Sequence, residues 1–207
     1  MITMDQADKI NSATRGYFWW GHKSNNKVYL LNYGNAHHVK KTIRNAHALE
    51  ATEFILKKRA SSQLTFAEHL NIPFDEHAGN CGEYTEHAVN RALTTDSVST
   101  VWTFGCREAE GVDHIFCVFN LLQAPSNTPC LERMSSENSY PDVIVCDPWA
   151  NIVCLYAEYP ERLREKMKTW NGLGKSILVG ISAISAMSAI EWGNRCLAAP
   201  ADFEQKY

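Results

Sequence analysis

The sequence predicts an α+β fold, and three observations carry this prediction. Between about residues 37 and 58, apolar residues recur at helical spacing, which indicates a long amphipathic helix. Between about residues 100 and 156, four short apolar runs are bounded by turn residues, which is typical of strands. Between these regions, the segment Asn80-Cys81-Gly82-Glu83 has the pattern of a helix start. We therefore expect a central antiparallel sheet with the Cys81 helix packed on it.

Composition limits what kind of protein this is. The chain has 207 residues, so we expect a single domain, helical over about 1–94 and rich in sheet over about 95–207. It is 45% hydrophobic and 21% charged, which is typical of a soluble globular protein. The formal net charge is −3 and no basic stripe stands out, so nucleic acid is not an expected partner. Residues 1–16 are polar and lack the apolar core of a cleavable signal peptide.

The N-terminal half is predicted to hold mostly helices. Residues 1–16 fit a short helix or a loose arm, and the apolar runs at 17–20 and 28–31 suggest a hairpin around a polar turn. A short helix is expected over 65–70 after the long one. The buried face of the long helix is predicted from its periodic apolar residues, which are Val39, Ile43, Ala46, Leu49, Phe54 and Ile55.

The second half begins with the helix from Cys81 to about Leu93 and continues as sheet. We expect strands at 100–104, 114–122, 143–147 and 152–156, and a charged helix at 161–170.

Two segments of this half stand apart by composition. The polar loop Pro125–Pro141 is expected to lie over or beside a cleft and to govern recognition. The apolar run Ser176–Trp192 is short for a transmembrane helix, so an element of the core is favoured over a membrane-docking one.

Three residues on these elements could act together chemically. Cys81 lies at a helix start, where unpaired N–H groups favour a thiolate, and the glycines on either side leave room for a substrate. His114 begins an alternating strand and could serve as the base that activates the thiol. Asp147 ends another strand before Pro148 and could orient the imidazole. The order Cys, His, Asp therefore predicts a nucleophile, a base and an orienting carboxylate.

Other chemistry was weighed against this triad. His77, Cys81 and His87 lie close in sequence, but their spacing matches no common zinc pattern, so we expect no metal. The seven cysteines include no CxxC pair, so we expect a reduced protein with neither a zinc ribbon nor a thioredoxin motif. No cofactor is expected.

The motifs resemble those of the papain-like and transglutaminase-like superfamily of cysteine enzymes. The resemblance rests on Gly79-Asn80-Cys81-Gly82-Glu83, on His114 to Phe119, and on the strand that ends in Asp147-Pro148-Trp149, and it covers roughly Gly79–Ala157. Within the superfamily, these motifs are most similar to those of bacterial toxin and effector domains. One departure is Asp75, which stands where papain-like proteases place an oxyanion-hole glutamine.

The resemblance implies an activity and a setting. Cys81 would be the nucleophile, His114 the general base and acid, and Asp147 its orienter, in a protease, glutamine deamidase or transglutaminase. The oxyanion-hole or cleft candidates are Asn80, Gly82, Trp102 and Trp149. The substrate would be a host protein, reached by a dedicated bacterial secretion system. The alternative is a catalytically silent binding module of the same fold.

Overall fold

A computed structural model shows that the chain is α+β with antiparallel sheets, as the sequence predicts. It describes residues 1–19, 23–29, 38–60, 72–95, 100–107, 111–126, 128–136, 140–179 and 185–207. The larger sheet has the strand order β5-β4-β3-β2-β8. Its strands are β2 (Val101–Arg107), β3 (Asp113–Phe119), β4 (Ile144–Asp147), β5 (Ile152–Leu155) and β8 (Ala201–Gln205). Four of them match predicted strands, whereas β8, which pairs with β2, is an addition from the C-terminal end.

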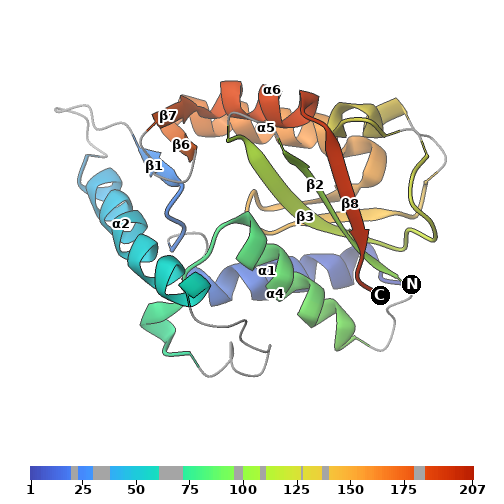
Figure 1. The fold of residues 1–207 in the computed structure, drawn as a ribbon, viewed down its shortest axis with the longest axis horizontal. Coiled ribbons are helices and arrows are strands. Elements are labelled where there is room, and N and C mark those ends of the chain that lie inside the picture. The colour runs from blue at the N-terminus through green and yellow to red at the C-terminus, as the bar shows by residue number, and fades with distance from the viewer. Residues whose placement is uncertain are drawn as a thin grey trace.

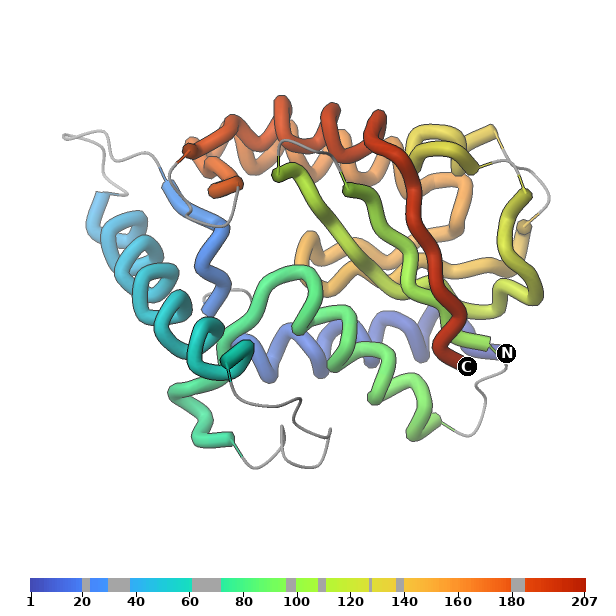
Figure 2. Tube along the Cα trace, in the orientation of Figure 1, coloured from blue at the N-terminus to red at the C-terminus, as the bar shows by residue number. Residues whose placement is uncertain are grey.

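Helices cover both faces of this sheet, as Figures 1 and 2 show. On one face lie α1 (Met4–Tyr17) and α4 (Cys81–Leu93), and on the other lie α5 (Tyr159–Gly172) and α6 (Ala189–Ala198). The first face buries alternate residues such as Cys117 and Phe119 against α1 and α4. The second buries Phe116 and Val118 in the larger core. The alternation of β3 therefore decides which helices each side chain meets.

A smaller sheet replaces the predicted hairpin. Its strands are β1 (Lys27–Tyr29), β6 (Lys175–Val179) and β7 (Ser185–Ser188), in the order β1-β6-β7. The hairpin prediction was wrong because Tyr17 ends α1 and β1 pairs with β6, far along the chain. Residues 20, 30 and 31 lie outside the described part.

The long helix α2 (His38–Ala60) is confirmed, and its predicted buried face is confirmed at Ile55 but wrong in its N-terminal part. Val39, Ile43 and Leu49 are exposed, and Val39 retains 68% of its accessible surface. The described buried residues of α2 are Ala48, Ala51 and Ile55. Helical spacing alone fits more than one stripe, and the small alanines allow close packing where the larger residues do not. The predicted helix at 65–70 lies outside the described residues.

The described part of the polar loop packs against helices, and none of its residues lines the pocket described below. Within it, a 3-10 turn, η3 (Leu131–Ser136), buries Leu131 and Met134 completely. This turn packs against α5 and α6, and Arg164 of α5 forms an ion pair with Glu132. The central part of the loop is therefore packed into the core, and its role in recognition stays a prediction.

The apolar run at 176–192 is divided among β6, β7 and the start of α6. Ile177 and Ala189 are buried in the core, and Ser188 caps α6 by accepting a hydrogen bond from the N–H of Glu191. Residues 180–184 lie outside the described part. No described helix is long and apolar enough to cross a membrane.

Candidate active site

His114 and Asp147 form a hydrogen-bonded pair inside the protein. Nε2 of His114 lies 2.7 Å from Oδ2 of Asp147, and both side chains are fully buried. The pairing follows from the register of the sheet, because Cys117 of β3 faces Cys146 of β4. His114, at the start of β3, and Asp147, at the end of β4, therefore project from the same face of adjacent strands.

Asp147 is held by three donors. Besides His114, the hydroxyl of Tyr159 donates to Oδ2 at 3.0 Å and the backbone N–H of Ala150 donates to Oδ1 at 2.9 Å. Burial alone raises the pKa of Asp147, but the positive charge of His114 and these hydrogen bonds outweigh burial, so the net pKa is below its ordinary value. Asp147 is thus an ionised, fully satisfied carboxylate.

The imidazole of His114 stands in an aromatic enclosure. Its ring centroid lies 5.1 Å from that of Trp149, 5.3 Å from that of Trp192 and 5.8 Å from that of Phe116. Nδ1 is buried and has no hydrogen-bond partner among the described residues. With Nε2 committed to Asp147, this second nitrogen is the one available to accept or give a proton.

Cys81 is the first residue of α4, and the structure places it beside β3. The hydroxyl of Thr85, one turn along α4, donates to the carbonyl of Ile115 at 2.9 Å. β3 pairs with β4 only from Cys117 onward, so Ile115 lies beyond the last paired residue on that edge. The backbone N–H of Ile115 acts on the Cys81 sulfur and favours its thiolate. The nucleophile candidate therefore lies next to the residue that follows His114.

The thiol of Cys81 is not activated by its surroundings alone. The side chain is only 8% exposed, and burial raises its pKa, with further raising by the carboxylates of Asp113 and Glu83. These effects outweigh the amide of Ile115, so the expectation of a lowered pKa at the helix start was wrong. Sγ of Cys81 forms no hydrogen bond with Nδ1 of His114, which has no partner among the residues that the structure describes. A thiolate here requires that the proton move to the imidazole.

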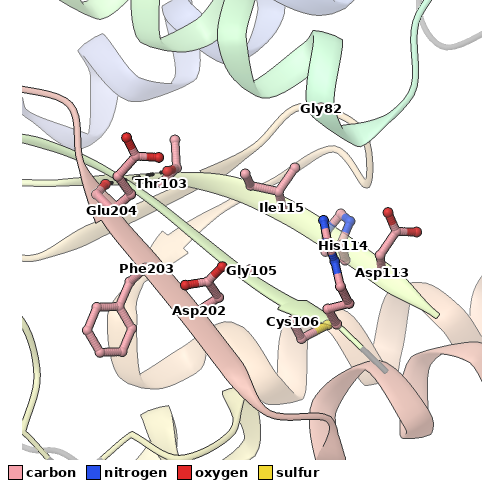
Figure 3. Close-up of a pocket in the computed structure, with 11 residues that line it drawn as sticks. Gly82, Thr103, Gly105, Cys106, Asp113, His114, Ile115, Asp202, Phe203 and Glu204 are labelled. Atoms are coloured by element: carbon pink, nitrogen blue, oxygen red, sulfur yellow. Dashed lines mark hydrogen bonds between the residues drawn. The ribbon is translucent and has the colours of Figure 1, made fainter. Parts of the chain in front are cut away.

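A pocket of about 300 Å³ opens beside the start of α4, on the sheet face that α4 covers. Figure 3 shows Gly82 above the sheet and His114 at the start of β3. The lining includes Thr103 and Gly105 of β2 and Asp202 of β8. An added Cβ at Gly82 would meet nothing within 4 Å, so the space above this first turn is open.

The predicted oxyanion-hole candidates separate into two groups. The side chains of Asn80, Trp102 and Trp149 are committed elsewhere: Nδ2 of Asn80 donates to Asn25 at 2.6 Å, and Nε1 of Trp102 donates to the carbonyl of Leu121 at 2.8 Å.

Nε1 of Trp149 lies 3.2 Å from Oδ1 of Asn26, so Trp149 acts as a wall of the His114 enclosure and not as a free donor. Gly82 remains: its backbone N–H and that of Cys81 belong to the first turn of α4, where no acceptor exists within the helix. The backbone, and not a side chain, is therefore the available oxyanion donor.

His77 does not join Cys81 in a metal cluster. Its ring nitrogens lie 3.0 Å from the carbonyl oxygen of Tyr17 and 2.9 Å from that of Ile72, and the ring stacks on Tyr17. Within the described ranges, no group of three His, Cys, Asp or Glu side chains is placed to hold a metal ion.

Sequence analysis missed Tyr159 and Trp192, which contact Asp147 and His114 respectively. Nothing in the local sequence marks either residue, because both come from helices, α5 and α6, that reach the pair only through tertiary packing. Ala150 could have been found, since the segment Asp-Pro-Trp-Ala has the turn pattern in which an aspartate binds a following N–H.

Comparison with protein families, with curated proteins and with solved structures finds no match to this chain. The assignment of function accordingly rests on the geometry of Cys81, His114 and Asp147.

Proposed function

We propose that this protein is a thiol enzyme that attacks a carboxamide or peptide bond with Cys81 through an acyl-enzyme intermediate. The observation that carries the proposal is the buried His114–Asp147 pair, whose Nε2–Oδ2 distance is 2.7 Å and whose Nδ1 has no partner in the described part of the chain. A histidine held by a carboxylate on one side and left open on the other is arranged for proton transfer.

The reaction would proceed in two halves. Nδ1 of His114 takes the thiol proton of Cys81, and Sγ attacks the carbonyl carbon while the N–H groups of Cys81 and Gly82 stabilise the oxyanion. The imidazolium gives its proton to the leaving amine, and the acyl group stays on sulfur. His114 then deprotonates a water molecule, which releases the acid, or an amine takes the place of water.

The arrangement supports a papain-like or transglutaminase-like core. In chain order, a helix begins with the nucleophile, the next strands carry the histidine and the aspartate, and these strands are neighbours in one antiparallel sheet. By the same resemblance, we propose that the chain is a secreted bacterial effector and that its substrate is an amide of a host protein, as a glutamine deamidase, protease or transglutaminase.

The rival is a catalytically silent module of the same fold that binds a host protein. Two observations favour it: Cys81 is buried with a raised pKa, and its sulfur has no hydrogen bond to His114. Against it stands the pocket of about 300 Å³, whose lining includes His114 and Gly82, the residue that follows Cys81.

Mass spectrometry of candidate host proteins separates the two. The proteins are incubated with the wild-type chain, with Cys81→Ala and with Cys130→Ala, which removes a half-buried thiol near Pro200. We expect deamidation, cleavage or cross-linking with wild type and Cys130→Ala, and none with Cys81→Ala. Binding that is equal in all three variants, with no covalent change in the bound protein, would establish the silent module instead.

A further inference from the structure

Five basic side chains from five different elements converge on one side of the protein, next to the turn that follows Asp147. This set, called here the cationic cluster, consists of Arg15 of α1, Lys27 of β1, Arg44 of α2, Lys166 of α5 and Lys175 of β6. It is separate from the pocket at Gly82, whose lining includes none of these residues.

The two innermost members are lysines enclosed by aromatic rings. Lys27 is 5% exposed, and its Nζ lies 4.2 Å from the ring centroid of Trp149 and 5.2 Å from that of Trp170. Lys175 is 6% exposed, and its Nζ lies 4.0 Å from the ring centroid of Trp170. Both Nζ atoms thus face one indole, and burial, followed by the charge of Lys175, lowers the pKa of Lys27 well below its ordinary value.

Helix α2 brings its positive charges to the same spot. Asn45 donates to the carbonyl of Tyr29 at 2.9 Å and accepts from its N–H at 2.8 Å, which fixes α2 against β1. Tyr29 is paired with Lys175 across the small sheet. Arg44, beside Asn45, and Lys41, whose Nζ is 6.0 Å from the Tyr29 ring, extend the cluster toward its exposed edge.

Four of the five members of the cluster have no ion-pair partner within the part of the chain that the structure describes. Lys27, Arg44, Lys166 and Lys175 form no ion pair among the residues that the structure describes. The carboxylate that acts on Lys27 is Asp147, which is already bonded to His114 and Tyr159.

The segments 30–37 and 180–184, next to β1 and β6, contain no Asp or Glu in the sequence. Burial, together with the charges of Arg44, Arg15 and Lys166, lowers the pKa of Lys175 to about 7. A buried charge that no carboxylate compensates destabilises a fold, so an anion that binds here would favour the charged forms of Lys27 and Lys175.

We infer that the cationic cluster is a binding site for a small anion that carries several phosphate groups. A single phosphate would neutralise only part of five basic groups, whereas a polyphosphorylated ligand can contact the half-buried rim (Arg44, Lys166) and approach the lysines behind it. Arginine and lysine are the side chains that bind phosphate oxygens best in proteins.

The site is joined to the turn after Asp147 by two hydrogen bonds. Nζ of Lys27 donates to the carbonyl of Trp149 at 2.5 Å, and a guanidinium nitrogen of Arg15 donates to the carbonyl of Pro148 at 2.8 Å. A ligand that fixes Lys27 and Arg15 also fixes this turn. Binding is therefore expected to stabilise the whole fold, independently of any chemistry at Cys81.

The test is a thermal-unfolding and calorimetric titration with the full chain carrying Cys81→Ala, so that catalysis plays no part. The probes are inositol hexakisphosphate, tripolyphosphate, orthophosphate and sulfate, compared at equal ionic strength. Phosphatidylcholine vesicles with and without phosphatidylinositol bisphosphate distinguish a lipid headgroup from a soluble ligand. Arg44→Gln and Lys175→Gln are the test variants, and Lys168→Gln, an exposed lysine of α5, is the matched control.

We expect the two polyphosphates to raise the unfolding midpoint and orthophosphate and sulfate to do so far less. Affinity should fall at least about tenfold in Arg44→Gln and Lys175→Gln, because each loses a charge-assisted contact, and should be unchanged in Lys168→Gln. Response to the lipid vesicles alone would identify the ligand as a headgroup. Equal shifts for all four anions, or equal affinity in all variants, would overturn the inference, and so would the absence of any response.

Discussion

Asp147→Asn tests the role of the buried pair most directly. The substitution keeps the size of the side chain and leaves an amide oxygen for the N–H of Ala150, but it removes the negative charge that lies 2.7 Å from Nε2 of His114. The amide nitrogen also donates where the carboxylate accepted, which favours the His114 tautomer with its proton on Nδ1. In that tautomer, Nδ1 cannot take the proton of Cys81.

The size of the effect follows from the Coulomb energy of the pair. For unit charges about 4 Å apart at an effective dielectric constant of about 20, the attraction between Asp147 and the imidazolium is about 4 kcal/mol. That energy corresponds to about three pK units of the imidazole. The population of the thiolate–imidazolium pair should fall accordingly, by a factor on the order of a hundred to a thousand.

The assay is the rate at which iodoacetamide alkylates Cys81, followed by mass spectrometry at limiting reagent and about pH 6.5. Asp147→Asn should slow this rate at least about a hundredfold. Tyr159→Phe should slow it less, because the carboxylate keeps its charge after losing one donor. Asp142→Asn, which changes an exposed carboxylate, is the control. A folded Asp147→Asn protein that is alkylated at the wild-type rate would show that Asp147 does not support the base.

Three further predictions concern the fold around the site. Gly105→Ala should destabilise the protein by about 1–3 kcal/mol in denaturant unfolding, because its Cβ would lie 2.5 Å from the carbonyl oxygen of His114, whereas Gly82→Ala has open space and should not. Leu131→Ala, in the polar loop, should lower the free energy of unfolding by about 2–5 kcal/mol, since the side chain is completely buried. An unchanged unfolding midpoint would show that the loop does not contribute to the core. Lys175→Met should stabilise the chain at neutral pH. Burial lowers the folded pKa of Lys175 to about 7, below its unfolded value. The free energy by which the wild-type protein is less stable than Lys175→Met is therefore largest below about pH 7. It should decrease as pH rises, by about 2 kcal/mol up to about pH 9. A difference between the two proteins that does not vary with pH would contradict that assignment.

The strands that carry the candidate triad were predictable because their signals are local. The sequence marks the start of one strand at His114, where an alternating run begins. It marks the end of another at Asp147-Pro148, where an apolar run stops. The pairing of these strands follows from their order along the chain. The sequence could not predict the residues that enclose the His114–Asp147 pair. Tyr159 and Trp192 contact this pair from α5 and α6, and only tertiary packing brings them there.

The errors have physical reasons of the same kind. The predicted hairpin failed because β1 pairs with β6, a partner about 150 residues away that local patterns cannot indicate. The face of α2 was misjudged because Val39 and Leu49 have the right spacing but stand on a helix that contacts its neighbours through alanines. Lys27 and Lys175 are buried by tertiary packing, which no local pattern in the sequence marks.

The burial of Cys81 has a consequence for how such a site must work. A helix start and a nearby amide favour the thiolate, yet burial together with Asp113 and Glu83 leaves the thiol pKa raised. The sulfur can then react at neutral pH only as part of an ion pair with His114, and the stability of that ion pair depends on Asp147. The reactivity of Cys81 should therefore depend on the charge of Asp147, which is distant in sequence, and not on the local field of its own helix. For this reason the alkylation rate of Asp147→Asn is more informative than that of any substitution within α4.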